Sequence, residues 1–183
     1  LVVEYGRGRD RIRRWTLAVV ERFAAHAALV IHNAMLLKEI RRMAATDGLT
    51  GIANRRTFEE TLAREISRAE RTGNPVTLVM IDVDQFKRLN DERGHQVGDA
   101  VLQALGSGLS ENLRPFDTVA RYGGEEFAVI MPGCTVEESV IAAERIRRRA
   151  VASTPVPEVT LSAGAATYPD SARDASELVG RAD

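Results

Sequence analysis

Cysteine is almost absent from this chain of 183 residues, which contains only Cys134. A single cysteine cannot form a disulfide within the chain, and structural disulfides are typical of oxidising compartments. The composition therefore predicts a protein of a reducing compartment such as the cytosol.

Long apolar runs and an excess of one charge are also missing. No stretch approaches the roughly 20 apolar residues that cross a bilayer, and Glu4, Arg7 and Arg9 interrupt any signal peptide early. Lys and Arg number 25 against 26 Asp and Glu, so no general field attracts nucleic acid or an acidic membrane. We expect a cytosolic protein, or a cytosolic fragment, that has neither nucleic acid nor a membrane as a partner.

Residues 1–10 begin with an apolar, β-prone run that has no partner strand nearby. A lone strand cannot satisfy its backbone hydrogen bonds, so we interpret it as the last strand of an upstream domain. Residues 11–45 contain neither proline nor glycine and predict one long helix. Its apolar side chains recur at alternating steps of three and four residues, at Val20, Phe23, Ala27, Val30, Ala34 and Leu37. This heptad pattern predicts a coiled-coil linker in a homodimer, and the alternative is a helix packed on the upstream domain.

Residues 46–183 have enough apolar content for a core of their own, since 44% of the chain is hydrophobic. We expect a turn at residues 46–56, a helix that Asn54 caps and that ends near Gly73, and a strand at residues 76–81 that is buried on both faces. A helix starting at Asp99, a hairpin around residues 118–131, a helix at 136–151, a strand at 159–168 and a helix from residue 175 follow. This order predicts an α/β (α+β) fold with a mixed, largely antiparallel sheet flanked by helices.

The hairpin carries Gly-Gly-Glu-Glu at residues 123–126 between two β-prone runs. Glycine accepts positive φ and lets another molecule approach the backbone closely. Two carboxylates on such a turn suit a metal ion or a phosphate-bearing ligand. An exposed acidic turn without function is the alternative for this motif alone.

Asp82 closes the buried strand, at a sheet edge where ligands commonly bind. If the strand and the hairpin share one sheet, Asp82 and Glu125 can converge on Mg²⁺ or Mn²⁺, with Lys87 close enough to neutralise a phosphoryl group. Such a set indicates phosphoryl or nucleotidyl transfer. Asp84 points the same way as Asp82 if the strand persists, and diverges if a helix starts there.

Asn90 and Asp99 have the chemistry to recognise guanine. A carboxylate accepts from the ring N–H and the exocyclic amine, and a carboxamide both donates and accepts. A site built on such bonds rejects analogues that lack them. The alternative is that Asn90 caps the end of one helix and Asp99 the start of the next.

Four segments then occur in one order: Asp-Gly-Leu-Thr-Gly and Asn-Arg-Arg within residues 47–56, Asp-x-Asp-x-Phe-Lys-x-x-Asn-Asp at 82–91, Gly-His-x-x-Gly-Asp at 94–99 and Gly-Gly-Glu-Glu-Phe at 123–127. With them the chain resembles a GGDEF-type diguanylate cyclase over residues 46–183. Residues 1–6 and the pattern at residues 23–34 are similar to the end of a GAF sensory domain. The resemblance implies a fold like nucleotidyl cyclases and the polymerase palm. It also implies condensation of two GTP molecules into cyclic di-GMP and two pyrophosphates by two facing domains.

The resemblance also implies roles for individual residues. Asp82, the Val83 carbonyl and Glu125 would bind Mg²⁺ or Mn²⁺, and Glu126 is a weaker candidate for metal or base. Glu125 would help to deprotonate the ribose 3′-hydroxyl, and Lys87 would stabilise charge in the transition state. The nucleotide would contact Phe86, Asn90, His95, Asp99, Gly123 and Gly124, although His95 as a hydrogen-bonded loop residue stays an alternative.

Arg114 and Asp117 match the family's Arg-x-x-Asp product-inhibition site, and Arg145 is a candidate second contact. Arg forks onto guanine or phosphate, and Asp accepts from the guanine edge. Ordinary surface charge is the alternative for these three residues.

One departure concerns the end of the sequence. The family continues after residues like Ala182 and Asp183 into a helix whose lysine and arginine hold the GTP phosphates, and the resemblance here stops before that helix. Two other functions therefore remain as interpretations: a module that senses GTP or cyclic di-GMP without turnover, and a dimerisation and signalling piece.

Overall fold

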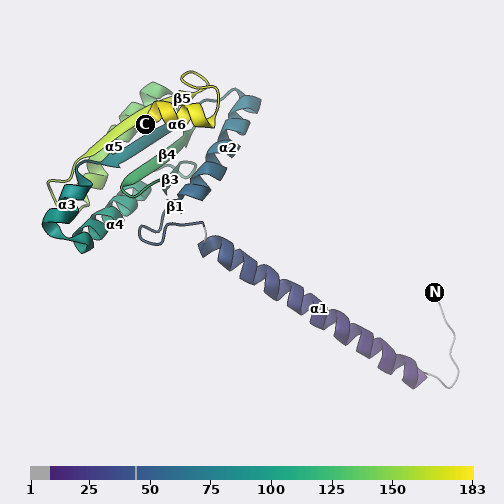
Figure 1. Cartoon of the computed structure of the whole chain (residues 1–183). Helices are drawn as coiled ribbons and strands as arrows, with labels where there is room; N and C mark the ends of the chain where they lie inside the picture. The colour runs from purple at the N-terminus through teal and green to yellow at the C-terminus, as the bar shows by residue number, and fades with distance from the viewer. Residues whose placement is uncertain (1–8, 44) are drawn as a thin grey trace. The chain divides into compact units, whose positions relative to one another are not determined.

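The computed structural model describes residues 9–43 and 45–183, so the strand predicted at residues 1–6 lies outside the described residues (Figure 1). The chain divides into two compact units, Leu1–Met43 and Ala44–Asp183. None of the helices in the described ranges combines the length and the apolar composition needed to span a bilayer.

The first unit contains the helix α1, Arg9–Met43. Three of its heptad positions are open to solvent, since Val20 is 56% exposed, Phe23 76% and Val30 65%. Such side chains normally pack against another apolar surface. The pairing of α1 in a coiled coil stays a prediction, because a single chain is described.

The second unit is built on a five-stranded sheet of order β1-β3-β4-β2-β5. The strands are β1 (Ala53–Asn54), β2 (Val76–Val83), β3 (Thr118–Arg121), β4 (Glu126–Pro132) and β5 (Leu161–Tyr168). Only β1 and β3 pair in parallel, and the other three pairs are antiparallel. The predicted mixed, largely antiparallel sheet and the hairpin of β3 and β4 are both confirmed.

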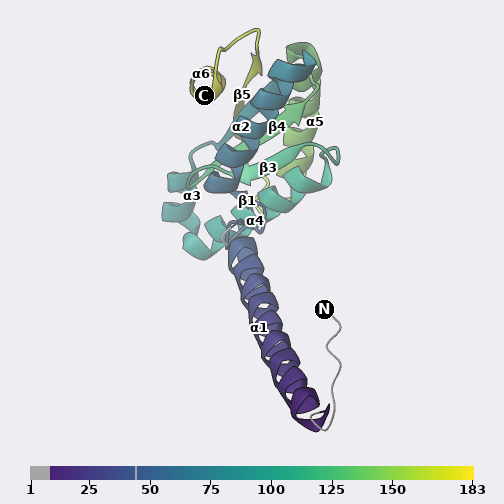
Figure 2. The same ribbon diagram turned by 90° about the vertical axis from the view of Figure 1, so that its right-hand side faces the viewer.

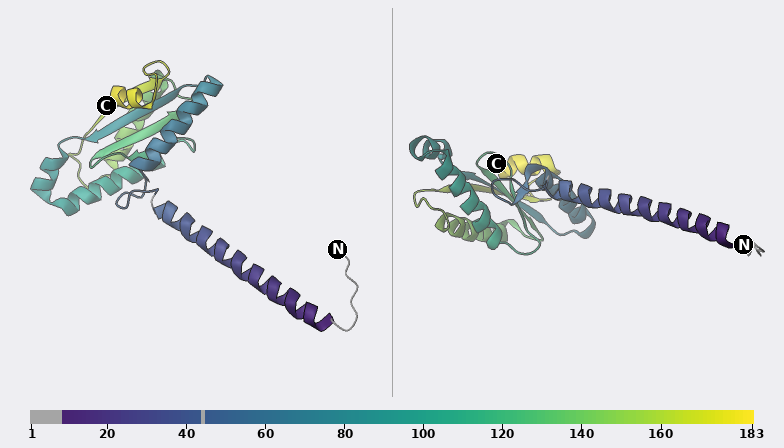
Figure 3. Two further views of the ribbon diagram at one scale, coloured as in Figure 1. Left: turned by 45° about the vertical axis from the view of Figure 1, so that its right-hand side comes forward. Right: turned by 90° about the horizontal axis from the view of Figure 1, so that it is seen from below.

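Helices cover both faces of this sheet, as Figures 2 and 3 show. The helices are α2 (Arg55–Thr72), α3 (Phe86–Arg93), α4 (His95–Glu111), α5 (Val136–Ala152) and α6 (Ala175–Ala182). Leu78 of β2 packs with the buried side of α2 and α6, whereas its neighbour Val79 packs with the buried sides of α4 and α5. Successive strand residues face opposite sides of a sheet, which explains why the apolar run of β2 is unbroken.

Local signals begin and end several of these helices where the sequence predicts. The side chain of Asn54 accepts a hydrogen bond from the Thr57 N–H at the start of α2, and Gly73 ends that helix in the left-handed conformation. Thr135 and Glu138 form a capping box at the start of α5.

The start of α4 differs from the prediction. The sequence predicted a loop up to Asp99, but α4 begins at His95, and only Gly94 separates it from α3. Gly94 has φ of 83°, which glycine adopts without strain, so one residue is enough to end α3 and start α4 in a new direction.

Candidate active site

The register of β2 against β4 brings two acidic residues together. Asp82 lies directly opposite Glu126 in this antiparallel pair. Side chains of opposed residues share one face of the sheet, with Cβ atoms about 4.5–5.5 Å apart. Asp82, near the end of β2, therefore lies next to Glu126, the second acid of the Gly-Gly-Glu-Glu turn.

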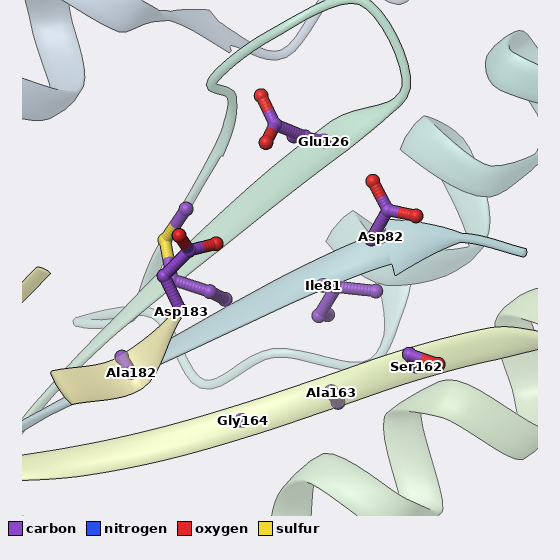
Figure 4. A pocket seen from close by; sticks show the side chains of 9 residues that line it. Ile81, Asp82, Glu126, Ser162, Ala163, Gly164, Ala182 and Asp183 are labelled. Carbon is purple, nitrogen blue, oxygen red and sulfur yellow. The ribbon is translucent and has the colours of Figure 1, made fainter. Parts of the chain in front are cut away.

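These two carboxylates open into a pocket of about 210 Å³ (Figure 4). The pocket is lined by Met80, Ile81, Asp82, Glu126, Ser162, Ala163, Gly164, Ala182 and Asp183. Figure 4 shows Asp82, Glu126 and Asp183 around the same hollow, from β2, β4 and the end of α6 respectively. Three acids at one pocket suit a positively charged occupant.

The electrostatics of Asp82 agree with such an occupant. Burial raises the pKa of Asp82 above its ordinary value, and the nearby charges of Asp84 and Asp183 raise it further. A divalent cation beside Asp82 would relieve this repulsion, so the donor set fits Mg²⁺ or Mn²⁺.

Within the described ranges, no three Asp, Glu, His or Cys side chains form a ready-made metal cage. Mg²⁺ sites commonly use only one or two carboxylates and complete the shell with substrate phosphates and water. The arrangement here is of that open kind.

The backbone of Glu125 is hydrogen-bonded to the end of β2. Its carbonyl oxygen accepts a hydrogen bond of 3.3 Å from the Val83 N–H, the residue after Asp82. Glu126, not Glu125, lines the pocket. The sequence ranked the two acids in the opposite order, and their roles as metal ligands stay predictions.

The two glycines at the hairpin tip provide space and are not needed for a positive φ angle. Neither Gly123 nor Gly124 has positive φ. A Cβ on Gly123 would lie 2.0 Å from Glu126 Oε2, whereas a Cβ on Gly124 would meet nothing within 4 Å. Gly123 therefore provides the space in which the Glu126 carboxylate lies, and Gly124 leaves the tip open to an approaching molecule.

Arg121 holds this tip in place. Its guanidinium donates to the Gly124 carbonyl oxygen at 2.7 Å and 3.2 Å, and to both carboxylate oxygens of Asp47 at 3.1 Å and 3.2 Å. Asp47 in turn accepts from the N–H and the hydroxyl of Thr50. Sequence reasoning missed Arg121, although it stands directly before the Tyr-Gly-Gly run and could have been paired with the acid of the 46–56 turn.

The turn after β2 separates the two aspartates that the sequence left undecided. The Asp84 carboxylate accepts hydrogen bonds of 2.6 Å from the hydroxyls of Thr160 and Ser162. These bonds lower the pKa of Asp84, while nearby Asp82 has its pKa raised. Asp84 therefore ties the turn to β5, whereas Asp82 faces the pocket.

The predicted guanine-recognition residues lie on α3 and α4. Asn90 is inside α3, whose C-cap is Gly94, and Asp99 is the fifth residue of α4, whose N-cap is also Gly94. The capping alternatives for both residues are therefore wrong. His95 is the first residue of α4, so its interpretation as a loop residue is wrong as well.

Lys87 is exposed on the first turn of α3, next to Phe86, which is buried in the core. Phe86 therefore anchors the start of α3 to the core. Its contact with a nucleotide remains a prediction.

The residues of the predicted inhibitory site lie near one another. The Arg114 N–H donates to Asp117 Oδ2 at 3.0 Å, and the Asp117 N–H donates to the Arg114 carbonyl oxygen at 3.0 Å. Burial raises the pKa of Asp117, and the charges of Arg114 and of Arg145 on α5 oppose that rise. Two cations and one acid thus share one corner of the domain.

Residues 44–183 match the family described as diguanylate cyclase, GGDEF domain. The chain is 40% identical over 152 residues to an uncharacterised protein of Bacillus subtilis, YhcK, covering 79% of this chain and 42% of that protein. It is 42% identical over 119 residues to the diguanylate cyclase DgcP of Pseudomonas aeruginosa, covering 65% of this chain and 18% of that enzyme. The chain thus spans less than half the length of these relatives.

A solved structure has a similar architecture. The coiled coil and GGDEF domain of DgcB from Caulobacter crescentus, in complex with c-di-GMP, superposes with a TM-score of 0.81 at 33% identity. The match covers 91% of each chain.

Proposed function

This chain belongs to the GGDEF family of diguanylate cyclase domains, and from that membership we propose that the protein condenses two GTP molecules into cyclic di-GMP. The observation that carries the proposal is the register that sets Asp82 beside the Glu125–Glu126 turn. It brings Asp82, from the second family segment, together with Glu126, from the fourth, in one pocket.

In this proposal the acids and one carbonyl hold divalent metal ions: Asp82, the Val83 carbonyl, Glu125 and Glu126. Bound Mg²⁺ or Mn²⁺ supplies charge neutralisation at the phosphates and lowers the pKa of a coordinated hydroxyl. The open donor set around Asp82 and its raised pKa support this assignment.

The chemical step is a nucleotidyl transfer. The 3′-oxygen of one GTP forms a bond to the α-phosphorus of the other, and the bond from that phosphorus to the bridging oxygen of pyrophosphate breaks. Glu125 takes the proton of the 3′-hydroxyl, and Lys87 stabilises the negative charge on the transferring group. A second transfer, in which the two nucleotides swap the roles of attacking and attacked group, closes the ring. Two copies of the domain must therefore face each other.

The bases are recognised on α3 and α4. Asp99 is exposed there and accepts from the guanine N–H groups, and Asn90 supplies its carboxamide. His95, Phe86, Gly123 and Gly124 complete the nucleotide-binding surface in this proposal. Selection of guanine over adenine follows because adenine lacks the ring N–H that Asp99 accepts.

We also propose that the product and an upstream domain control the enzyme. Cyclic di-GMP binds at Arg114, Asp117 and Arg145 and inhibits, and an upstream GAF-like sensory domain acts through α1. The mutual proximity of the two cations and Asp117 supports the inhibitory site.

One assay tests both levels. Purified protein with GTP and Mg²⁺ should yield cyclic di-GMP on chromatography, and Glu125→Gln should lower the rate by about 100-fold or more because the base is lost. Glu137→Gln, an exposed acid in the first turn of α5, is the control and should not change the rate. Turnover should slow as product accumulates, and Arg114→Ala should remove that slowing. Normal turnover of Glu125→Gln would refute the catalytic assignment, and unchanged inhibition of Arg114→Ala would refute the inhibitory site.

A further inference from the structure

Asn90 and Gly98 meet where α3 and α4 pack together. A Cβ on Gly98 would lie 1.9 Å from Asn90 Oδ1, 3.0 Å from Asn90 Cγ and 3.1 Å from Phe86 Cζ. No real pair of atoms comes this close, so the Asn90 carboxamide occupies the space that any larger residue at position 98 would fill. Gly98 has an ordinary helical φ, so the backbone conformation does not require glycine here.

Two features at this contact are unfavourable for the protein by itself. Glycine inside a helix is a poor helix former, yet Gly98 is buried within α4. Asn90 Oδ1 is also buried and has no hydrogen-bond partner among the described residues. A buried polar atom without a partner is costly, and such costs are typical of functional sites.

A second buried glycine of the same helix serves a different purpose. A Cβ on Gly106 would lie 3.0 Å from Thr50 Cβ and 3.4 Å from the Thr50 carbonyl oxygen, a tight contact that involves neither Asn90 nor Phe86. Gly98, in contrast, makes room for a polar group that has no bond within the described chain.

We propose that Gly98 is a positioning residue for guanine specificity: its missing side chain forms the seat that orients the Asn90 carboxamide. This inference rests on the proposed function. The two ends of a carboxamide have nearly the same size, so the seat accepts either end and leaves the other to face a ligand. The outward end can donate or accept, which matches a guanine edge that carries both a carbonyl and N–H groups. Asp99 follows Gly98 directly, so α4 carries both the seat and the acceptor for the base.

Calorimetry with Mg²⁺ and guanosine α,β-methylene triphosphate, which cannot release pyrophosphate, measures base recognition without turnover. Gly98→Ala should weaken binding by about tenfold or more, because one base hydrogen bond is lost. The preference for this analogue over its adenosine counterpart should narrow by a similar factor. Gly106→Ala, the same substitution in the same helix, should leave both quantities within about twofold.

A double-mutant cycle separates the seat from a general effect on α4. In an Asn90→Ala background there is no carboxamide to displace, so Gly98→Ala should cause no further loss of affinity. It should also lower the melting temperature less there than in the wild type, because only the contact with Phe86 Cζ at 3.1 Å then has to be relieved. An equal loss of affinity in both backgrounds, or a full guanosine preference in Gly98→Ala, would overturn the proposal.

The cycle also distinguishes failure of this inference from failure of the proposed function. If the wild type binds no guanosine analogue, the proposed function fails, while a smaller fall of melting temperature in the Asn90→Ala background than in the wild type still supports the seat. If Gly98→Ala does not fold but the double variant does, the steric coupling is shown directly. If the wild type prefers guanosine and the cycle is additive, the seat alone is refuted.

Discussion

Arg121 joins the tip of the β3–β4 hairpin to the loop that precedes α2. Its side chain is 17% exposed and that of Asp47 is 23% exposed, so the ion pair is screened less than one on the open surface. Two other nitrogens of the guanidinium, Nε and Nη2, donate hydrogen bonds to the Gly124 carbonyl oxygen. Arg121 therefore fixes the peptide that leads into Glu125, and lysine could not make the same forked set of bonds.

Asp47 gives this connection a measurable pH dependence. Burial raises its pKa, but hydrogen bonds from Thr50 and Arg121 outweigh that effect and hold the pKa below its ordinary value of 3.8. A carboxylate whose pKa is lower in the folded state stabilises fully above the unfolded value, and this stabilisation is lost as pH falls through the folded value.

We predict that Asp47→Asn lowers the melting temperature at pH 7 by a few degrees, equivalent to about 1–2 kcal/mol, and that the difference from the wild type shrinks below about pH 4. Thermal unfolding between pH 3 and pH 7 measures this. Glu60→Gln is the control, because Glu60 pairs with Arg56 on the open surface and should contribute little. A difference that stays constant down to pH 3 would show that the ionised carboxylate is not the cause.

The sequence predicted that Asp82 lies close to the acids of the hairpin turn, but it did not predict the roles of the glycines. The acids at 82, 125 and 126 could be found from strand ends and a hairpin signal, because both are local patterns. The role of Gly123 as space for Glu126, and of Gly98 as space for Asn90, depends on contacts between residues that no local pattern encodes. The same holds for Arg121, whose partner Asp47 is 74 residues away.

At the scale of elements, the turn between β2 and α3 sets the direction of the candidate site. Gln85 is the one described residue other than glycine with positive φ, at 55°. The Asp84 N–H donates to the Thr160 carbonyl oxygen at 3.0 Å, and its carboxylate binds two hydroxyls on the same segment. The chain is thus held to β5 while it turns from a strand into the helix that carries Lys87 and Asn90.

This turn predicts a difference between two substitutions at one position. Gln85→Val should cost about 1–3 kcal/mol, because a β-branched side chain is strained at positive φ. Gln85→Gly should remain within about 0.5 kcal/mol of the wild type, since relief of strain offsets the greater freedom of the unfolded chain. Urea unfolding monitored by circular dichroism compares the two. Equal costs for valine and glycine would mean that the backbone angle does not matter here.

Periodicity predicted most element bounds, and the exception is informative. The sequence placed the start of α4 at Asp99 because the preceding residues contain two glycines and read as a loop. The helix starts at His95 because packing against α3 outweighs the low propensity of Gly98. Tertiary packing between α3 and α4 therefore sets the start of α4, where helix propensity is low.

At the scale of the whole molecule, α1 remains an element in need of a partner. Phe23 and Val30 lie among the exposed apolar residues of a helix that spans Arg9–Met43. An isolated helix of this kind gains little stability from propensity alone. A second copy would cover these side chains and would also bring two GGDEF domains into one assembly, as the proposed condensation of two nucleotides requires.

We predict that Phe23→Glu raises the dissociation constant of the dimer by about tenfold or more, because it places a charge in the apolar seam. His32→Glu, on the opposite side of the helix by its spacing, should change the constant little. Sedimentation equilibrium measures both. A wild type that stays monomeric at the highest concentrations, or a Phe23→Glu variant that dimerises normally, would show that α1 has another partner.

The sharing of a divalent cation by β2 and the hairpin is tested most directly by Mn²⁺ binding, followed by electron paramagnetic resonance in the presence of the α,β-methylene GTP analogue. Asp82→Asn and Glu125→Gln should each weaken Mn²⁺ binding by at least about tenfold, while Glu137→Gln should bind as the wild type does. Undiminished Mn²⁺ binding in both of the first two variants would contradict the account.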